Sequence, residues 1–253
     1  MAPLIPVTYA VQGEKTSPSF ARAFALGCRG VAVPHDQGLR PGSMAAFGSP
    51  PTWPMFDQVI ARGDDWYYGD HGLFRRFRYY RVTKNQLQHD GRGQASDLRF
   101  RALRVDLAPG WQRGSSIVVC PNSSIYMQRF GLDARAWAAG IVAQLAARTD
   151  RPVILRWKSQ ADRRPLYVDL HDAYLLIAYS SAAAVEALAA GVPVCTLAPW
   201  ASTARMGICS IDQVEWPYYP DLQERDQFLF NLANSQWTLE EIAAGMAWKT
   251  LNH

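Results

Sequence analysis

Short apolar runs alternate with amphipathic stretches along most of this chain, and loops rich in Gly and Pro separate them. A short apolar run bounded by turn residues is typical of a buried strand, whereas apolar residues repeating every three or four positions are typical of a helix. In the first third of the chain this pattern predicts strands at 4–11, 30–34, 44–47, 66–68 and 79–83, and helices at 18–26 and 53–62. Such alternation implies a parallel sheet covered by helices.

A polar, basic and weakly periodic stretch at 86–112 then interrupts the pattern. We therefore expect two lobes, one formed by residues 1–112 and the other by residues 113–253. The second lobe resumes with predicted strands at 115–120, 152–157 and 174–179 and a further one beginning at 194, and with a short element at 166–170 and helices at 133–148, 223–234 and 238–251. The last helix opens with Thr-Leu-Glu-Glu, which is a capping box. The predicted class is α/β, with two small Rossmann-like lobes, parallel sheets and C-terminal helices.

Composition fits this class. The chain has 253 residues, 49% of them hydrophobic, which is enough for one large core or two modest ones. Its apolar segments fall short of the ~18 residues that span a bilayer, and the first residues lack the features of a secretion signal, so we expect a cytoplasmic protein without a membrane partner. The four cysteines are far apart and the histidines are scattered. This spacing favours structural thiols and predicts no metal site.

Basic charge is concentrated in one region. Residues 74–113 carry ten basic and three acidic side chains, a net charge of +7 in a chain whose total is +4. Aromatic residues interleave the arginines at the start of this window, and such a mixture can meet phosphates with cations and bases with rings. The candidates for nucleic-acid contact are Arg75, Arg76, Arg78, Tyr80, Arg81 and Lys84. The alternative is a solvated strand and loop whose arginines pair with acidic residues elsewhere.

Polar residues follow several predicted strands, and in open α/β sheets ligands bind beyond the carboxyl ends of the strands. Asn122 and Ser124 follow one strand and can hold a base, ribose or phosphate, although Pro-Asn-Ser-Ser is also ordinary turn chemistry. Arg156 and Lys158 lie at and after the end of the next strand, and their spacing of two sends both cations to one side of the sheet. They can neutralise a leaving diphosphate, or can instead form surface salt bridges.

The segment 172–195 has the pattern of strand, turn, helix and strand, with its polar groups at the turn. Ser180 and Ser181 are expected to cap the helix, whose free N–H groups and dipole favour an anion beside them. Glu186 is expected several residues into that helix among small apolar neighbours. It is either a surface residue or an acceptor for two vicinal ribose hydroxyls.

Residues 170–193, Leu-His-Asp-Ala-Tyr-Leu-Leu-Ile-Ala-Tyr-Ser-Ser-Ala-Ala-Ala-Val-Glu-Ala-Leu-Ala-Ala-Gly-Val-Pro, resemble the nucleotide-sugar pocket of GT-B glycosyltransferases. The same stretch is similar to capsule polysaccharide Kdo transferases and to the peptidoglycan N-acetylglucosaminyltransferase. Residues 66–74 with 79–85, and residues 236–248, resemble small tailed-bacteriophage proteins of glycosyltransferase type. This resemblance implies a GT-B fold, a nucleotide-sugar donor linked to UDP or CMP, no cofactor, Ser180 and Ser181 facing phosphate, and Glu186 facing ribose.

An inverting transferase also needs a base near the acceptor oxygen. His35 and Asp36 follow one apolar strand, and Asp70 and His71 follow another in a glycine-flanked turn, although simple loop polarity also explains these pairs. Asp70 is our first choice, His71 the second and Asp36 the third, because the loop of Asp70 joins the basic window that would bring DNA. Gly13 and Lys15 follow the first strand and are candidates for the donor phosphates.

Together these patterns predict a metal-independent glycosyltransferase that moves a sugar to a hydroxyl. The sequence contains no GxGxxG, GxxxxGK[ST] or HExxH motif, which disfavours nicotinamide, P-loop and zinc-protease chemistry. Because some phage enzymes of the resembled type glycosylate hydroxymethylated bases, we expect phage DNA in a bacterial host as the acceptor. The alternatives are a transferase acting on a surface glycan or lipid, and a noncatalytic module that binds DNA or a nucleotide.

Overall fold

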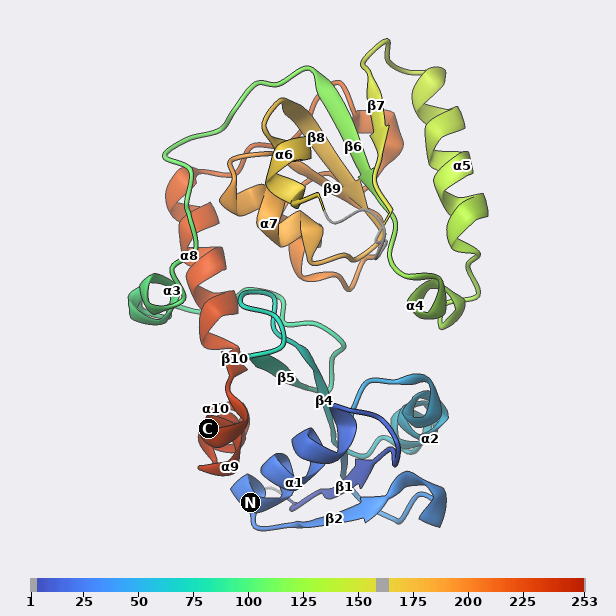
Figure 1. The fold of residues 1–253 in the computed structure, drawn as a ribbon, viewed down its shortest axis with the longest axis vertical. Coiled ribbons are helices and arrows are strands. Elements are labelled where there is room, and N and C mark those ends of the chain that lie inside the picture. The colour runs from blue at the N-terminus through green and yellow to red at the C-terminus, as the bar shows by residue number, and fades with distance from the viewer. Residues whose placement is uncertain (1–3, 158–163, 253) are drawn as a thin grey trace. The chain divides into compact units, whose positions relative to one another are not determined.

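The computed structural model describes residues 4–157 and 164–252, and the chain forms two compact units, each with its own sheet (Figure 1). Unit 1 consists of Met1–Leu87 and Leu232–His253, and unit 2 of Gln88–Asn231. These units differ from the expected lobes, because the boundary lies near the start of the polar stretch 86–112 instead of at its end, and the end of the chain returns to the first unit. The return is made by strand β10, which pairs with β5.

The sheet of unit 1 has the strand order β10-β5-β4-β3-β1-β2. Strands β1, β2, β3 and β4 are mutually parallel, whereas β5 is antiparallel to β4 and β10 is antiparallel to β5. The expectation of a parallel sheet is thus confirmed for the four strands that begin the chain. The bounds are β1 Val7–Ala10, β2 Val31–Pro34, β3 Met44–Phe47, β4 Trp66–His71, β5 Tyr80–Lys84 and β10 Gln236–Trp237.

Helices cover both faces of this sheet. They are α1 (Ser17–Cys28), α2 (Trp53–Arg62), α9 (Leu239–Ala243) and α10 (Met246–Asn252), with 3-10 turns η1 (His35–Gln37) and η2 (Pro50–Thr52). The single closing helix expected at 238–251 is two helices, because Gly245 has a positive φ of 82°. Its capping box is confirmed, with Thr238 and Glu241 bonding each other's backbone. Gly27 lets α1 approach α9, since a Cβ there would lie 2.0 Å from the carbonyl oxygen of Ile242.

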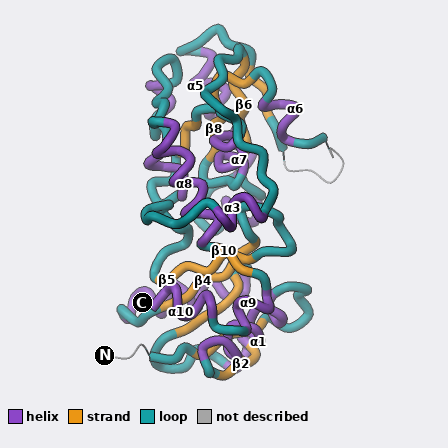
Figure 2. The backbone as a smooth tube through the Cα atoms, turned by 90° about the vertical axis from the view of Figure 1, so that its left-hand side faces the viewer, coloured by secondary structure: helices purple, strands orange, loops and turns teal. Residues whose placement is uncertain are grey.

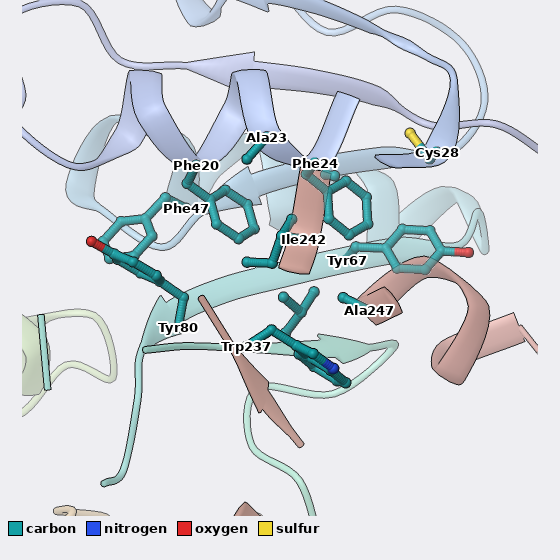
Figure 3. Packing of buried hydrophobic residues seen from close by; sticks show 12 residues of the cluster. Phe20, Ala23, Phe24, Cys28, Phe47, Tyr67, Tyr80, Trp237, Ile242 and Ala247 are labelled. Carbon is teal, nitrogen blue, oxygen red and sulfur yellow. The ribbon is translucent and has the colours of Figure 1, made fainter. Parts of the chain in front are cut away.

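Alternation along β4 places consecutive aromatic residues in two different cores. Tyr67 points into a cluster with Phe20 and Phe24 of α1, shown in Figure 3 together with residues of α9 and α10. Trp66 and Tyr68 point into the opposite cluster, where α2 covers the sheet. Unit 1 is therefore a three-layered arrangement in which the returning C-terminal segment completes one layer.

Unit 2 is built on a parallel sheet with the order β7-β6-β8-β9, which Figure 2 shows in orange among its helices. The strands are β6 Ser116–Cys120, β7 Val153–Leu155, β8 Ala173–Ala178 and β9 Val194–Thr196. The helices that lie in or begin in this unit are α3 Leu98–Ala102, α4 Ser124–Gln128, α5 Ala134–Ala146, α6 Leu166–Leu170, α7 Ala183–Ala189 and α8 Leu222–Asn234, with 3-10 turns η3 Ser202–Met206 and η4 Ile211–Gln213.

Both faces of this second sheet are covered too. Ile141 and Leu145 of α5 pack with Ile117 and Val119 of β6 on one face, and α7 packs against β8 and β9. Strands β6, β8 and β9 are almost entirely buried, which is the usual state of a parallel sheet between helices, whereas the edge strand β7 is partly exposed. The predicted class, an α/β protein with two Rossmann-like parts, is confirmed. Within residues 4–157 and 164–252, no helix combines the length and apolarity needed to cross a membrane.

Candidate functional site

Two polar residues meet at the carboxyl edge of the sheet in unit 2. Strands β6 and β8 are adjacent and parallel, with Cys120 opposite Ala178, so Asn122 and Ser180 each lie two residues beyond this matched pair. The backbone N–H of Ser180 donates to Asn122 Oδ1 at 3.1 Å, and Asn122 Nδ2 donates to Ser180 Oγ at 3.4 Å. The two strand ends are thus joined by a reciprocal hydrogen-bonded pair at the place where open α/β sheets bind ligands.

Gln88 stabilises the segment that follows β8 through hydrogen bonds to Ser180 and Ser202. Its Nε2 donates to the backbone oxygen of Ser180 at 3.0 Å, and its Oε1 accepts from the N–H and the hydroxyl of Ser202 at 2.9 and 3.2 Å. All three residues are buried. Buried polar groups with complete hydrogen bonding give a unique geometry. Sequence reasoning missed Gln88 because it lies in the weakly periodic stretch that predicted no element.

The two serines do not cap a long helix as expected. Helix α7 begins only at Ala183, has seven residues, and has no side-chain cap at Ala182. Ser181 Oγ accepts from the N–H of Ala183 at 3.3 Å, whereas the Ser180 hydroxyl is engaged by Asn122. The prediction was wrong for Ser180 because a partner on a neighbouring strand, distant in sequence, competes for its side chain.

Glu186 and Ser124 are both exposed in unit 2. Glu186 lies on α7 and is exposed, whereas Val185 and Leu188 of the same helix are buried. Ser124 is the first residue of α4, and Ser123 rather than Ser124 makes the cap, accepting from the N–H of Tyr126 at 3.4 Å.

Arg156 is bound by a buried carboxylate rather than left open at the edge. Its Nη1 forms an ion pair with Asp169, which is 3% exposed, and Arg164 binds the other oxygen of Asp169 at 2.8 Å. The expectation of a cation held ready for phosphate is therefore corrected, since Asp169 already compensates the charge of Arg156. Lys158 lies outside the described residues.

Arg156 and Glu186 nevertheless lie near the same strand end. Burial raises the pKa of the Cys120 thiol to about 12, while the charge of Arg156 lowers it and the charges of Asp169 and Glu186 raise it. The backbone N–H of Arg156 donates to the carbonyl of Val119 in β6 at 2.9 Å, which places Arg156 beside the end of this strand. The structure thus brings Asn122, Ser180, Arg156 and Glu186 to one region of unit 2.

Four aromatic side chains lie at this edge as well. Phe130 stacks on Trp200 with centroids 4.8 Å apart, and Tyr126 and Tyr179 contact both rings at 5.3 to 6.3 Å. All four are partly exposed. We call this group the aromatic cluster. Sequence reasoning missed it because its members are spread over 75 positions of the chain.

Unit 1 also collects candidate residues at a carboxyl edge. Gly13, with a φ of 81°, and Lys15 lie exposed between β1 and α1, and Asp36 lies exposed in the turn after β2. Asp70 and His71 end β4. Strands β1 and β3 separate β2 from β4, and three strand spacings amount to about 14 Å. Asp36 and Asp70 share an edge of the sheet but are not neighbours.

Asp70 and His71 belong to β4 rather than to the turn that the sequence predicts. They face Arg81 and Tyr80 across the β4–β5 ladder. The strand continues through Gly69 because that position has no room for a side chain: a Cβ there would lie 2.3 Å from the Phe20 ring. Glycine here reflects packing, not a turn.

The Asp70 carboxylate forms an ion pair with the Arg81 guanidinium, whose side chain is 7% exposed, while that of Asp70 is 25% exposed. Burial alone raises the pKa of Asp70, but the charge and hydrogen bond of Arg81, together with the backbone N–H of His71, outweigh it and hold this pKa below its ordinary value. Asp70 is therefore ionised at neutral pH and keeps one partly accessible side.

His71 lies among aromatic rings. Its imidazole centroid is 5.2 Å from Phe47, 4.8 Å from Phe77 and 5.8 Å from Tyr80. Its ring is half-buried, and its orientation is determined by this packing. His71 thus ends β4 beside Asp70.

The loop between β4 and β5 presents basic side chains to solvent. Arg75, Arg76 and Arg78 are exposed, and Phe77 is 71% exposed with Arg76 over its ring at 5.2 Å. Gln236 bonds both the N–H and the carbonyl of Phe74 at 3.1 and 3.0 Å, which fixes the start of this loop. We call residues 75–78 the basic loop tip.

The other three candidates for nucleic-acid contact, Tyr80, Arg81 and Lys84, are buried or paired with an acidic residue. Tyr80 and Arg81 are 8% and 6% exposed, so their predicted contact with nucleic acid is contradicted by burial. Lys84 forms an ion pair with Asp65 at 2.8 Å. The basic window 74–113 is also divided, since residues from Gln88 onward belong to unit 2. Strand alternation and long-range pairing, which charge counting ignores, decide these outcomes.

No group of three or more His, Cys, Asp or Glu residues suited to a metal ion occurs in the part of the chain that the structure describes. Metal independence remains a prediction. Of the four cysteines, Cys28, Cys120 and Cys195 are buried and Cys209 is exposed, all as free thiols.

No protein-family model and no curated protein matches this sequence. Among solved structures, the chain is similar to Thermosulfurimonas dismutans KpsC, beta Kdo 2,4 transferase, with a TM-score of 0.55, 11% identity and coverage of 92% of each chain. It also aligns with T. dismutans KpsC, beta Kdo 2,7 transferase, with a TM-score of 0.47, 12% identity and coverage of 96% of this chain and 99% of the other. The first of these similarities shows a shared fold over nearly the whole length.

Proposed function

We propose that this protein is a glycosyltransferase that moves a sugar from a nucleotide-activated donor to a hydroxyl acceptor. The observation that carries the proposal is the hydrogen-bonded pair of Asn122 and Ser180 at the carboxyl ends of β6 and β8. Neutral amides and hydroxyls in that position suit a ribose or a phosphate. The shared fold with a structure described as a Kdo transferase supports the same reading.

The donor, a sugar linked to UDP or CMP, is proposed to bind at the carboxyl edge of the sheet in unit 2. Ser181 and Ser124 are assigned to phosphate or ribose, and Glu186, exposed on α7, accepts hydrogen bonds from two ribose hydroxyls. Arg156 is not assigned to the leaving phosphate, because its charge is compensated by Asp169. The roles of Gly13, Lys15 and Lys158 stay predictions from the sequence.

The transfer step is proposed to use Asp70 as the general base. The acceptor oxygen attacks the anomeric carbon, the bond from that carbon to the nucleotide phosphate breaks with its electron pair, and the hydroxyl proton passes to the Asp70 carboxylate. Asp70 is ionised at neutral pH, since Arg81 holds its pKa below the ordinary value. His71 is second choice and Asp36 third, the latter on a strand three positions away.

For the acceptor we propose a hydroxymethylated base in phage DNA. The exposed Arg75, Arg76 and Arg78 of the basic loop tip, with the exposed Phe77 ring, support this choice. Guanidinium groups meet backbone phosphates, and a ring stacks on an unpaired base. A surface glycan or lipid acceptor is the alternative, and DNA binding without catalysis is the third.

The first experiment tests the donor. Nucleotide release from a panel of CMP-, UDP- and GDP-sugars is measured with the parent protein, with Asn122→Ala and with Gln144→Ala, a control on the exposed side of α5. We expect release with one donor, and kcat/KM lowered at least tenfold in Asn122→Ala only. Release that is absent with every donor, or equal in both variants, contradicts the proposal.

The second experiment tests the base. Asp70→Asn should lower kcat by more than a hundredfold with little change in donor KM, because general-base catalysis contributes about 10²–10⁴. Asp150→Asn, at an exposed position with no proposed role, is the matched control and should retain activity. Thermal melting of both variants checks the fold. Full activity of Asp70→Asn would contradict the assignment of Asp70 as the base. Variants of His71 and Asp36 would then test which of these two residues is the base.

The third experiment tests the acceptor through the salt dependence of DNA binding. Each phosphate contact contributes a log–log slope of about −0.9 on duplex DNA. Arg76→Ala with Arg78→Ala should therefore flatten the slope by roughly one to two units. Arg22→Ala with Arg135→Ala removes the same charge from two exposed helix positions and should change it far less. Salt-independent or absent binding favours the glycan or lipid acceptor.

A further inference from the structure

The aromatic cluster beside the Asn122–Ser180 pair has no role in the transfer step. We infer that Tyr126, Phe130, Tyr179 and Trp200 form the seat for the nucleobase of the donor nucleotide. This inference rests on the proposed function, because it names a part of the same donor site. The base would lie against ring faces, while the ribose and phosphate would reach the amide and hydroxyls next to them.

The cluster is assembled from three segments that each follow a parallel strand. Tyr126 and Phe130 come after β6, Tyr179 directly follows β8, and Trp200 comes after β9. Ala198 donates its N–H to the carbonyl of Tyr179 at 2.9 Å, which extends the β8–β9 pairing and brings Trp200 beside Tyr179. All four rings therefore lie at the carboxyl edge of one sheet, where ligands bind in this kind of fold.

The rings are supported from within the unit. Met127 of α4 is fully buried and its carbonyl accepts the N–H of Phe130 at 2.9 Å. Ser123 caps the same short helix. The segment that carries Tyr126 and Phe130 is thus anchored, while the rings stay partly exposed. Prearranged rings of this kind bind a planar partner with little loss of conformational freedom.

A nucleotide fits the chemistry of this region better than a purely apolar partner. Tyr179, Ser180 and Ser181 are consecutive, so the Cα atoms that carry an aromatic ring and two hydroxyl side chains are at most about 8 Å apart. A nucleotide has the same division, with a flat base next to a polar ribose and phosphate. Every base has a π-face that can stack on an aromatic side chain.

The test is calorimetric binding of cytidine, uridine, guanosine and adenosine nucleotides, with ribose 5-phosphate as the ligand that lacks a base. The parent is compared with Trp200→Leu and Phe130→Leu, and with Trp216→Leu as control, since Trp216 is 78% exposed in the same unit. We expect Kd for the preferred nucleotide to rise about tenfold or more in the first two variants. Ribose 5-phosphate binding and the control should be unchanged.

Trp200→Phe keeps a ring and should recover most of the affinity, which separates stacking from damage to the fold. Nucleotide binding that depends on Trp200 in a protein without sugar transfer supports the inference while the proposed function fails. Sugar transfer with nucleotide affinity unchanged in Trp200→Leu and Phe130→Leu overturns the inference alone. The inference is also overturned if Trp200→Leu and Phe130→Leu weaken the binding of ribose 5-phosphate as much as that of the nucleotide, or if the parent binds no nucleotide.

Discussion

The two units present different chemistry at the corresponding edges of their sheets. In unit 1 the edge carries charge, and its central group is the Asp70–Arg81 ion pair across β4 and β5. In unit 2 the edge is mainly neutral, with the Asn122–Ser180 pair next to aromatic rings. Both edges lie at the carboxyl ends of parallel strands.

This difference shows how one type of sheet can serve two purposes. An ionised carboxylate beside an arginine can accept a proton, whereas neutral amides, hydroxyls and rings can hold a nucleotide without a large cost of burying charge. The antiparallel addition of β5 supplies the arginine in unit 1, and the fully parallel arrangement of unit 2 lets loops from β6, β8 and β9 converge. The following predictions test this contrast.

The largest effect is expected from breaking the charged edge. Arg81→Leu leaves Asp70 largely enclosed without its counter-charge, and we expect a loss of about 3 kcal/mol in the free energy of unfolding. Urea unfolding measures the loss, and hydrogen exchange should locate it in β4 and β5. Arg76→Ala, which removes an exposed arginine, should stay within about 0.5 kcal/mol. Equal losses in both variants would show that the Asp70–Arg81 ion pair stabilises the fold no more than an exposed arginine does.

A smaller effect is expected at the neutral edge. Asn122→Ala removes the acceptor for the Ser180 N–H, which should cost about 1–2 kcal/mol locally. Hydrogen exchange should therefore increase in residues 178–184 and remain unchanged in β4. The control Gln144→Ala should alter neither region. Exchange that rises throughout both units would contradict the independence of the two edges.

Acidification should weaken unit 1 through Asp70. Because the folded protein lowers the pKa of this group, its ion pair contributes stability above the pKa of the unfolded chain and loses it as pH falls through the lower folded value. The free energy of unfolding should thus fall between about pH 5 and pH 2, and less steeply in Asp70→Asn. If the free energy of unfolding depends on pH in the same way in the parent and in Asp70→Asn, Asp70 does not cause the loss of stability in acid.

The smallest perturbation is a thiol titration of the native protein. Cys209 is exposed and should react first, while Cys120 and Cys195, whose pKa values burial raises to about 12, should react only after local opening. Since Cys120 ends β6 beside the neutral edge, Asn122→Ala should speed its modification and leave that of Cys28 unchanged. Mass spectrometry of the labelled peptides distinguishes the four sites.

Much of the architecture was predictable from local pattern. The strand at 115–120 and the helix at 53–62 are found at nearly the expected positions, because strand and helix periods of apolar residues are local properties. The expected unit boundary was wrong because β10 pairs with a strand some 150 residues earlier, and two-residue strands have no distinctive pattern.

The candidate site was only partly predictable. Asn122 and Ser180 were identified from their positions after apolar strands, but their pairing, the support from Gln88 and the convergence of four rings are contacts between distant segments. Arg156 and Arg81 were identified as basic residues, whereas their carboxylate partners appear only in the folded chain.

The amino-acid sequence by itself determined the α/β class, the residues at the strand ends and the regional concentration of charge, since periodicity, turn chemistry and charge are properties of neighbouring residues. Only the tertiary structure decided which charges are neutralised, which rings gather and which serine is free to cap a helix. The physical reason is that burial, pairing and stacking depend on partners that the chain brings together only by folding.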